Sequence, residues 1–384
     1  MIRTDKMPDI YLKKIKHLSQ FSGWLKELPL AIPLDRPVVL KPNLVFPAPG
    51  TSGVVSDARL VGMLVEYLRE IGVRDITIAE GPGLGVDAWE AFERTGFSEL
   101  ARRYQVPLLD LNQAPRYPVK WYDGQLDLPV IFKDAYYINL PKMKTHINTL
   151  VTLGLKNQKG LLSYADKKRF HKNGLHRPVA ELYKIIRPDF TILDGFTAIE
   201  GDGPLFAGKK VGFKVLIAGA DPLAVDAAGC RLMSIDPLEV DHLSLASQMR
   251  LGSLEATIIG DRLDACARRF KRPQMEMLKM LGLHNQRTPL ACSLCGGSAR
   301  EGLLSSARDP RKWAASLMPV LRQMVFGRVD FVYGKNAEIP KNSRKVIAVG
   351  ECTKHLKDLP DVIWVDGCPP SPEMLAEAFA KLKK

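Results

Sequence analysis

The chain has 384 residues, of which 46% are hydrophobic and 25% are charged, so it is long enough for two or three domains with a sizeable core. No apolar run reaches the ~18 residues that a membrane-spanning helix needs, and no secretory signal is present, so we expect a cytoplasmic protein without a membrane span. The net charge of +13 favours anionic partners such as phosphates, carboxylates, nucleic acid or an acidic redox partner. Because no zinc-finger, RNA-recognition or helix-turn-helix pattern accompanies the basic residues, we do not expect sequence-specific binding of nucleic acid.

The first part of the chain alternates strand and helix patterns after a helical lead-in over residues 1–36. Apolar runs without alternation, such as VVL at residues 38–40, predict strands that are buried on both faces. This order predicts an α/β domain over residues 1–260, with a mostly parallel sheet flanked by helices. The expected strands cover residues 36–40, 75–79, 107–111, 135–140, 189–194 and 212–218, with a hairpin at 119–130, and the expected helices cover 58–71, 86–94, 97–104, 178–186 and 222–233.

Basic residues gather directly after the strand expected at residues 135–140, in the stretch PKMKTHINTLVTLGLKNQKG. In an extended segment Lys142, Lys144 and His146 point to one side. Because lysines beyond a buried strand are costly to hide, the stretch indicates either a cleft that holds an anion or a solvated basic loop. The ends of strands are where ligands bind in open α/β sheets, and the first strand ends in KPN. The predicted ligand-binding residues are Lys41, Asn43, Lys142, Lys144, Lys156 and Asn157.

Two histidines and two acids are the candidate catalytic residues. His146 and His171, the latter in a polar loop or lid over residues 164–176, titrate near neutral pH and are candidates for a general acid. Glu200 and Asp202 lie in the turn AIEGDGP, where they either bind a divalent metal such as Mg²⁺ with the anion or orient the histidines. The alternative for both acids is a plain turn with the neighbouring glycines.

A basic helical connector over residues 261–287 leads to a smaller α/β domain over residues 288–384. Its expected elements are an apolar strand leading into CSLC, a helix at 313–326, strands at 345–350 and 362–367, and a last helix at 372–382. Four of the six cysteines of the chain fall at or near the ends of these strands, whereas Cys230 and Cys266 have no such neighbours and are expected to be buried.

The cysteines of the smaller domain can meet, because the ends of parallel strands share one edge of a sheet. Cys292 and Cys295 form a C-x-x-C pair, and Cys352 and Cys368 each follow a later strand. Four thiolates fit either an iron–sulfur cluster or zinc. The single cysteines, the Cys-Pro step and the adjacent glycines favour a [4Fe–4S] cluster, with a zinc site or free thiols as the alternatives.

Two resemblances accompany these patterns. The segments VVLKPNLV, YINLPKMKTHINTLVTLGLKNQKG, FTILDGFTAIEGDGP and ADPLAVDAAG, with the loop that holds His171, together resemble the domain-of-unknown-function family 362, which implies no established reaction. KVIAVGEC and VIWVDGCPPSPEMLAEAF resemble the cluster-binding half of the small subunits of nickel–iron hydrogenases and respiratory complex I. The second resemblance implies a flavodoxin-like domain with one [4Fe–4S] cluster, whose ligands here are Cys292, Cys295, Cys352 and Cys368.

The sequence thus predicts a cytoplasmic iron–sulfur redox enzyme or electron-transfer protein, with a redox partner protein, that acts on an anionic small molecule bearing phosphate or carboxylate. One alternative is a non-redox binding or scaffold protein with a structural zinc site and a phosphorylated or nucleic-acid ligand. Another is a Mg²⁺-dependent transferase or hydrolase that uses Asp202 and Asp226.

Overall fold

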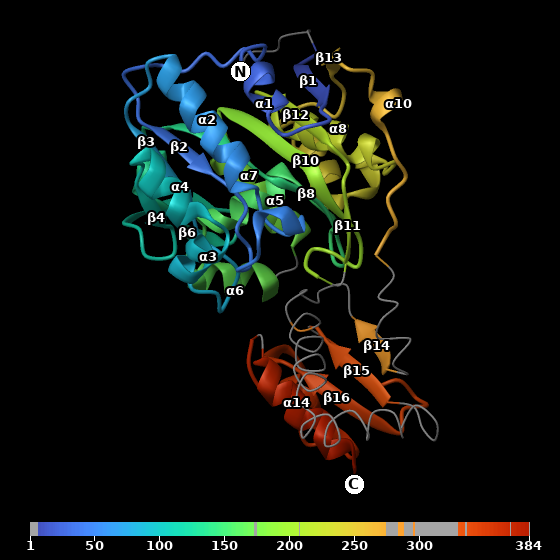
Figure 1. Ribbon diagram of the computed structural model, residues 1–384. Helices are drawn as coiled ribbons and strands as arrows, with labels where there is room; N and C mark the ends of the chain where they lie inside the picture. Colours follow the sequence, from blue (N-terminus) through green and yellow to red (C-terminus); the bar gives the residue numbers. More distant parts are fainter. Residues whose placement is uncertain are drawn as a thin grey trace. The chain divides into compact units, whose positions relative to one another are not determined.

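The computed structural model describes residues 7–172, 175–206, 208–273, 283–287, 295, 329–334, 336–368 and 370–383. The chain divides into two compact units. Unit 1 comprises Met1–Lys167 and His176–Pro273, and unit 2 comprises Lys168–Leu175 and Gln274–Lys384. The division at residues 273 and 274 falls inside the predicted connector, of which residues 283–287 form a strand. Figure 1 shows both units, coloured along the chain.

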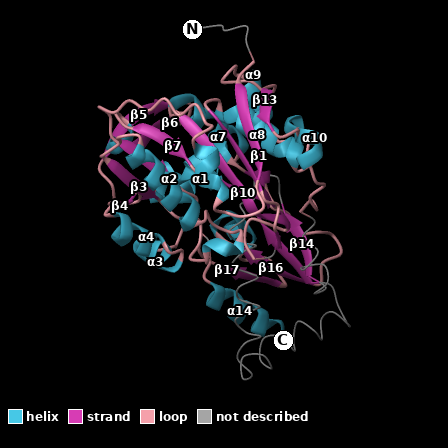
Figure 2. Cartoon of the chain, turned by 45° about the horizontal axis from the view of Figure 1, so that its top comes forward, coloured by secondary structure: helices cyan, strands magenta, loops and turns pink. Residues whose placement is uncertain are grey.

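An eleven-stranded sheet forms the centre of unit 1. Its main order is β13-β1-β12-β10-β7-β2-β3-β4, and β8, β9 and β11 extend it from β10. Strands β10, β7, β2, β3 and β4 are parallel, and β12 runs antiparallel between β10 and β1. The sheet is therefore mixed, and the prediction of a mostly parallel sheet is confirmed. The long strand β10 lies beside β7 (Figure 2). The strands are β1 (Asp9–Lys14), β2 (Val38–Lys41), β3 (Ile76–Glu80), β4 (Leu108–Asp110), β7 (Tyr136–Asn139), β8 (Lys142–His146), β9 (Leu150–Thr152), β10 (Phe190–Gly201), β11 (Gly208–Val211), β12 (Val215–Gly219) and β13 (Thr257–Gly260).

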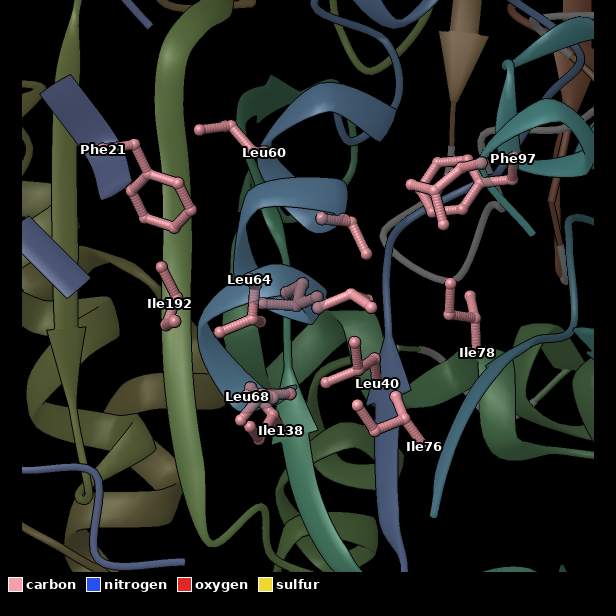
Figure 3. Packing of buried hydrophobic residues seen from close by; sticks show 14 of the residues in the cluster. Phe21, Leu40, Leu60, Leu64, Leu68, Ile76, Ile78, Phe97, Ile138 and Ile192 are labelled. Atoms are coloured by element: carbon pink, nitrogen blue, oxygen red, sulfur yellow. The ribbon is translucent and has the colours of Figure 1, made fainter. Parts of the chain in front are cut away.

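Helices cover both faces of this sheet, because successive residues of its strands point to opposite sides. Ile192 of β10 and Leu216 of β12 belong to one hydrophobic cluster, and their neighbours Leu193 and Ile217 belong to another. Figure 3 shows Leu60, Leu64 and Leu68 packing in the first cluster. The helices of the first cluster are α1 (Gln20–Leu25), α2 (Ala58–Glu70), α3 (Ala88–Arg94) and α4 (Phe97–Tyr104), and those of the second are α5 (Gly154–Asn157), α7 (His176–Ile185), α8 (Pro222–Leu232), α9 (Asp241–Gln248) and α10 (Leu263–Cys266).

Helix starts follow the chemistry of their capping residues. The Asp57 carboxylate accepts a hydrogen bond from the backbone N–H of Arg59 and caps α2, and Asp221 caps α8 before Pro222. A hairpin of β5 (Arg116–Trp121) and β6 (Gly124–Pro129) forms a separate sheet where one was expected.

Two local predictions were wrong. The helical lead-in contains strand β1, because the buried Ile10 and Leu12 alternate with half-buried positions and pair with β12. The polar loop or lid over residues 164–176 contains helix α6 (Tyr164–Lys172). Ser163 starts this helix, since its hydroxyl oxygen accepts a hydrogen bond from the N–H of Asp166 and its O–H donates to the Asp166 carboxylate.

Unit 2 contains a four-stranded parallel sheet in the order β14-β15-β16-β17. Phe331, Ile347 and Val365 of this sheet pack with Leu375 and Phe379 of the last helix. Cys230 and Cys266 of unit 1 are buried, as predicted. The expected helix at 313–326 and the strand leading into CSLC lie outside the described residues. The elements of unit 2 are β14 (Leu283–Arg287), β15 (Val329–Tyr333), β16 (Lys345–Val349), β17 (Val362–Val365) and α14 (Pro372–Ala380).

Candidate functional site

The strand order of unit 1 reverses between β2 and β7. From β2 the chain moves outward to β3 and then β4, and it returns to add β7 on the other side of β2. Lys41, the last residue of β2, is in register with Asn139, the last residue of β7. In open α/β sheets, ligands bind outside the carboxyl ends of the strands at such a reversal. The predicted ligand-binding residues follow these strand ends.

Two buried lysines at this place are neutralised by carboxylates that the sequence analysis did not select. Lys41 Nζ lies 2.9 Å from Glu80 Oε1, and Lys142 Nζ lies 2.6 Å from Asp194 Oδ2. Burial lowers the pKa of Lys41 although Glu80 acts to raise it. Both acids lie in strands of the sheet, Glu80 in β3 and Asp194 in β10. Each ends a strand expected from the sequence or directly follows one, so the pattern that pointed to Lys41 could have pointed to them as well.

Three further buried lysines have no carboxylate in ion-pair range among the described residues. Lys144 donates to Asn43 Oδ1 (2.6 Å) and to the carbonyl of Val54 (2.7 Å). Lys167 donates to two carbonyls at 3.0 Å and to Asn112 Oδ1 at 2.6 Å. Lys156, which is 8% exposed, has one hydrogen bond, a long one of 3.4 Å to Thr152 Oγ1. When they are protonated, these lysines carry a positive charge that no carboxylate of the described residues neutralises.

Their pKa values follow from that setting. Burial, and secondarily the charge of Lys142, lowers the pKa of Lys144 to about 7. Burial also lowers the pKa of Lys167 to about 7, although Glu80 opposes the shift. The pKa of Lys156 is lowered well below its usual range by burial and by the charges of Lys159 and Lys144. An anion placed among these groups would reverse the shifts.

A chain of asparagine side chains holds the site together. Asn43 Nδ2 donates to Asn157 Oδ1 (2.9 Å), and Asn157 Nδ2 donates to Asn139 Oδ1 (2.8 Å). Asp226 accepts the N–H groups of Gly154 (2.6 Å) and Leu155 at the start of α5, and burial raises its pKa to about 7. Lys156 and Asn157 are therefore presented by a turn that is fixed on two sides.

Glycine is required where this turn meets the ion pair of Lys41. A Cβ at Gly160 would lie 2.1 Å from Glu80 Oε1 and 2.6 Å from Lys41 Nζ. Only a residue without a side chain lets the backbone approach the charged pair this closely.

All six predicted ligand-binding residues are buried, and hydrogen bonds connect Asn43, Lys144 and Asn157 directly. The sequence analysis missed Glu80, Lys167, Asp194 and His242. His242 carries no strand-end signal because it lies in a helix, α9.

The candidate catalytic residues have different surroundings. His146 ends β8, and its Nδ1 accepts the N–H groups of Asn148 (3.0 Å) and Thr149 (3.3 Å), so a proton on the neutral ring is held by Nε2. The turn that holds Asp202 meets the same strand end, because the carbonyl of Gly203 accepts the N–H of Ile147 at 3.1 Å. Glu200 pairs with Arg268 at 3.3 Å. The side chain of His171 lies outside the described residues.

Cysteines of unit 2 gather at the ends of β16 and β17. A Cβ at Gly350 would lie 3.4 Å from Cys295 Sγ and 3.6 Å from Cys352 Sγ. The N–H of Glu351 donates to the carbonyl of Gly367 at 3.3 Å, which brings the neighbouring Cys368 to the same edge. Cys292 lies outside the described residues. Within the described part of the chain, no three histidine, cysteine, aspartate or glutamate side chains are grouped closely enough to hold a metal ion.

Comparison with known proteins identifies the class of protein. The model of the family DUF362, a domain of unknown function, matches residues 38–231, and the chain belongs to this family. The thylakoid-associated protein sll1697 of Synechocystis sp. is 30% identical over 228 residues, which cover 57% of this chain and 69% of that protein. No solved structure matches the chain. In the described residues, no helix has the length and apolar character to cross a membrane.

Proposed function

We propose that unit 1 binds an anionic small molecule at the carboxyl ends of β2, β7 and β8, through a phosphate or carboxylate group. The observation that carries this proposal is the set of buried lysines without carboxylate partners, Lys144, Lys156 and Lys167, beside the reversal of strand order. A buried ammonium group without a counter-ion costs several kcal/mol, and a bound anion would remove that cost. Charge-assisted hydrogen bonds from lysine to a bound oxyanion supply the missing partner.

Calorimetry of the full-length protein with inorganic phosphate, and separately with acetate, tests this proposal. Lys156→Met should weaken binding by about tenfold or more, since a hydrogen bond to a charged group contributes about 1.5–3 kcal/mol. The exposed Lys16 provides the control variant Lys16→Met, which has the same chemistry outside the site. If wild-type protein bound neither anion, or Lys156→Met bound as wild type does, the proposal would fail.

A second proposal concerns unit 2, where we infer an iron–sulfur cluster in a flavodoxin-like domain. The supporting observation is the approach of Cys295 and Cys352 to Gly350, with Cys368 next to the adjoining Gly367. The lack of a side chain at Gly350 leaves room beside both sulfur atoms, as a cluster requires. When bound, such a cluster supplies one-electron transfer, and the protein would then be an iron–sulfur redox enzyme or electron-transfer protein acting on the anion.

Iron and acid-labile sulfide analysis of protein purified without oxygen tests the cluster. We expect about four iron and four sulfide per chain and their loss in Cys352→Ala. One zinc and no sulfide would contradict the redox proposal and favour a structural zinc site. Anion binding by unit 1 is measured separately, so its outcome does not depend on this result.

A further inference from the structure

Two histidines face each other where α7 packs on α9. His176 is the first residue of α7, and His242 is the second residue of α9. Their Nδ1 atoms lie 3.4 Å apart, and the planes of the two rings are inclined by 38°. His242 is completely buried, whereas the side chain of His176 is 26% exposed. The pair therefore reaches from solvent into the interior of unit 1.

The distance between the two nitrogen atoms fits a metal site better than a hydrogen bond. Hydrogen bonds from N–H groups are about 2.7–3.2 Å long, so a separation of 3.4 Å makes a weak one. Zn²⁺ binds imidazole nitrogen at about 2.0–2.1 Å with tetrahedral angles, which places two such nitrogens about 3.3–3.4 Å apart. Ligands at right angles, as in square-planar sites of Cu²⁺ or Ni²⁺, would lie only about 2.9 Å apart. The spacing therefore favours zinc.

A carboxylate favours the required tautomer of the outer ring. Asp241 Oδ2 lies 3.5 Å from Nε2 of His176, the ring nitrogen that is not directed at His242. Because a neutral imidazole has one proton and the carboxylate favours it on Nε2, the Nδ1 atom of His176 keeps its lone pair. A carboxylate behind a ligating histidine is a usual arrangement in zinc sites. The negative charge of Asp241 also offsets the positive N-terminal ends of α7 and α9.

The inner ring is held in the form that binds a metal. Burial first, and then the charges of His176 and Lys156, lowers the pKa of His242 well below its usual range. His242 is therefore neutral at physiological pH, and neutral imidazole is the ligating form. Its Nε2 has no hydrogen-bond partner among the described residues, so no contact of that atom holds the proton on Nδ1 instead.

We propose that His176 and His242 bind one Zn²⁺ ion through their Nδ1 atoms, with Asp241 as the positioning residue behind His176. The described residues offer no third histidine, cysteine or carboxylate to the same ion, so its other positions are left for water or for oxygen atoms of a small ligand. Open positions are typical of catalytic rather than structural zinc sites. The pair uses none of the lysines and cysteines of the two proposed functions, so it stands independently of both.

Equilibrium dialysis of the full-length protein against Zn²⁺, after a chelator has removed bound metal, tests the proposal. We expect wild-type protein to bind one zinc ion that His176→Gln loses. Asp241→Asn should bind the ion at least about tenfold more weakly, with nearly the same Tm of the metal-free protein, because the carboxylate acts through the ring of His176. The exposed His17 provides the matched control, since His17→Gln makes the same change away from the pair. If His176→Gln does not fold, His242→Gln takes its place.

Nuclear magnetic resonance of the wild-type protein labelled at histidine separates this site from the cysteines. Zinc should move the ring-nitrogen signals of His176 and His242 and leave those of His17 unchanged, and Cys352→Ala should show the same shifts. The proposal is refuted if these two signals do not move, if His176→Gln binds zinc as wild type does, or if Cys352→Ala abolishes the shifts. Absence of zinc binding by wild-type protein would refute it as well.

Discussion

Replacement of Lys156 by methionine tests whether this buried lysine binds a ligand or stabilises the fold. Methionine has a similar length, no charge and no polar hydrogen. Among the described residues, Lys156 loses one hydrogen bond, the 3.4 Å contact with Thr152 Oγ1, and the repulsion from Lys144 and Lys159 disappears with it. Because an unsatisfied buried polar group costs about 1–3 kcal/mol, we expect Lys156→Met to stabilise unit 1 by about 2 kcal/mol.

For a unit of this size, each kcal/mol corresponds to about 2–4 °C, so the Tm should rise by about 4–8 °C while phosphate binding weakens by about tenfold or more. Differential scanning calorimetry without phosphate measures the first effect. Lys167→Met is the matched control, because Lys167 is as deeply buried but donates three good hydrogen bonds, to Gly81, Pro82 and Asn112. That variant should lower the Tm. A lower Tm for Lys156→Met as well would refute the reasoning, since it would show that the ammonium group of Lys156 stabilises the fold.

Three other predictions follow from the same contacts. Burial lowers the pKa of Lys144 to about 7, and a bound anion raises it, so binding takes up a proton above about pH 7. The affinity for phosphate should therefore fall from pH 7 to about pH 9, and equal affinities in calorimetry at both values would contradict this. Gly160→Ala should lower the Tm, whereas Gly212→Ala, with open space around the added Cβ, should change it little; thermal denaturation of both variants decides. Asp226→Ala should destabilise unit 1 by about 2–5 kcal/mol in denaturant unfolding and weaken phosphate binding, because the N–H groups of Gly154 and Leu155 lose their acceptor. Unchanged stability would show that the turn does not depend on the Asp226 carboxylate.

The sequence predicts much of this fold because the strands of a parallel sheet carry continuous apolar runs. Residues such as Val38, Val39 and Leu40 have no alternation, and they form a strand buried on both faces. Strand β1 escaped recognition since Tyr11, Ile15 and Leu18 also fit a helical period, and only pairing with β12 decides between the two. Local periodicity cannot supply that information.

The candidate site was predictable in part for a similar reason. Strand ends meet at one edge, so Lys41 and Lys144 could be grouped without knowing the structure. Which carboxylate neutralises which lysine depends on the order of strands: Asp194 reaches Lys142 because β10 pairs with β8, and Glu80 reaches Lys41 because β3 pairs with β2. The pair of His176 and His242 depends on the packing of α7 on α9 and has no counterpart in sequence spacing.

Titration of the buried groups links the stability of unit 1 to its ligand. Burial raises the pKa of Asp226 from 3.8 to about 7, so the folded state binds more protons than the unfolded state in that window and stability falls as the pH rises from about 4 to 7. Burial lowers the pKa of Lys144 and Lys167 from 10.5 to about 7, so the unfolded state binds more protons above pH 7 and stability rises from about 7 to 10.5. Together these groups place a minimum of stability near pH 7.

A bound anion should raise the stability of unit 1 more near this minimum than at higher pH. It favours the charged lysines, and at a concentration 100 times the Kd it stabilises the folded state by about 2.7 kcal/mol. Lys144 is about half protonated at pH 7 and largely deprotonated at pH 9, so the stabilisation should be larger at pH 7 than at pH 9. Unfolding curves at both values, with and without phosphate, measure this difference. Equal stabilisation at pH 7 and pH 9 would contradict a contact between the ligand and Lys144, whose protonation changes between the two values.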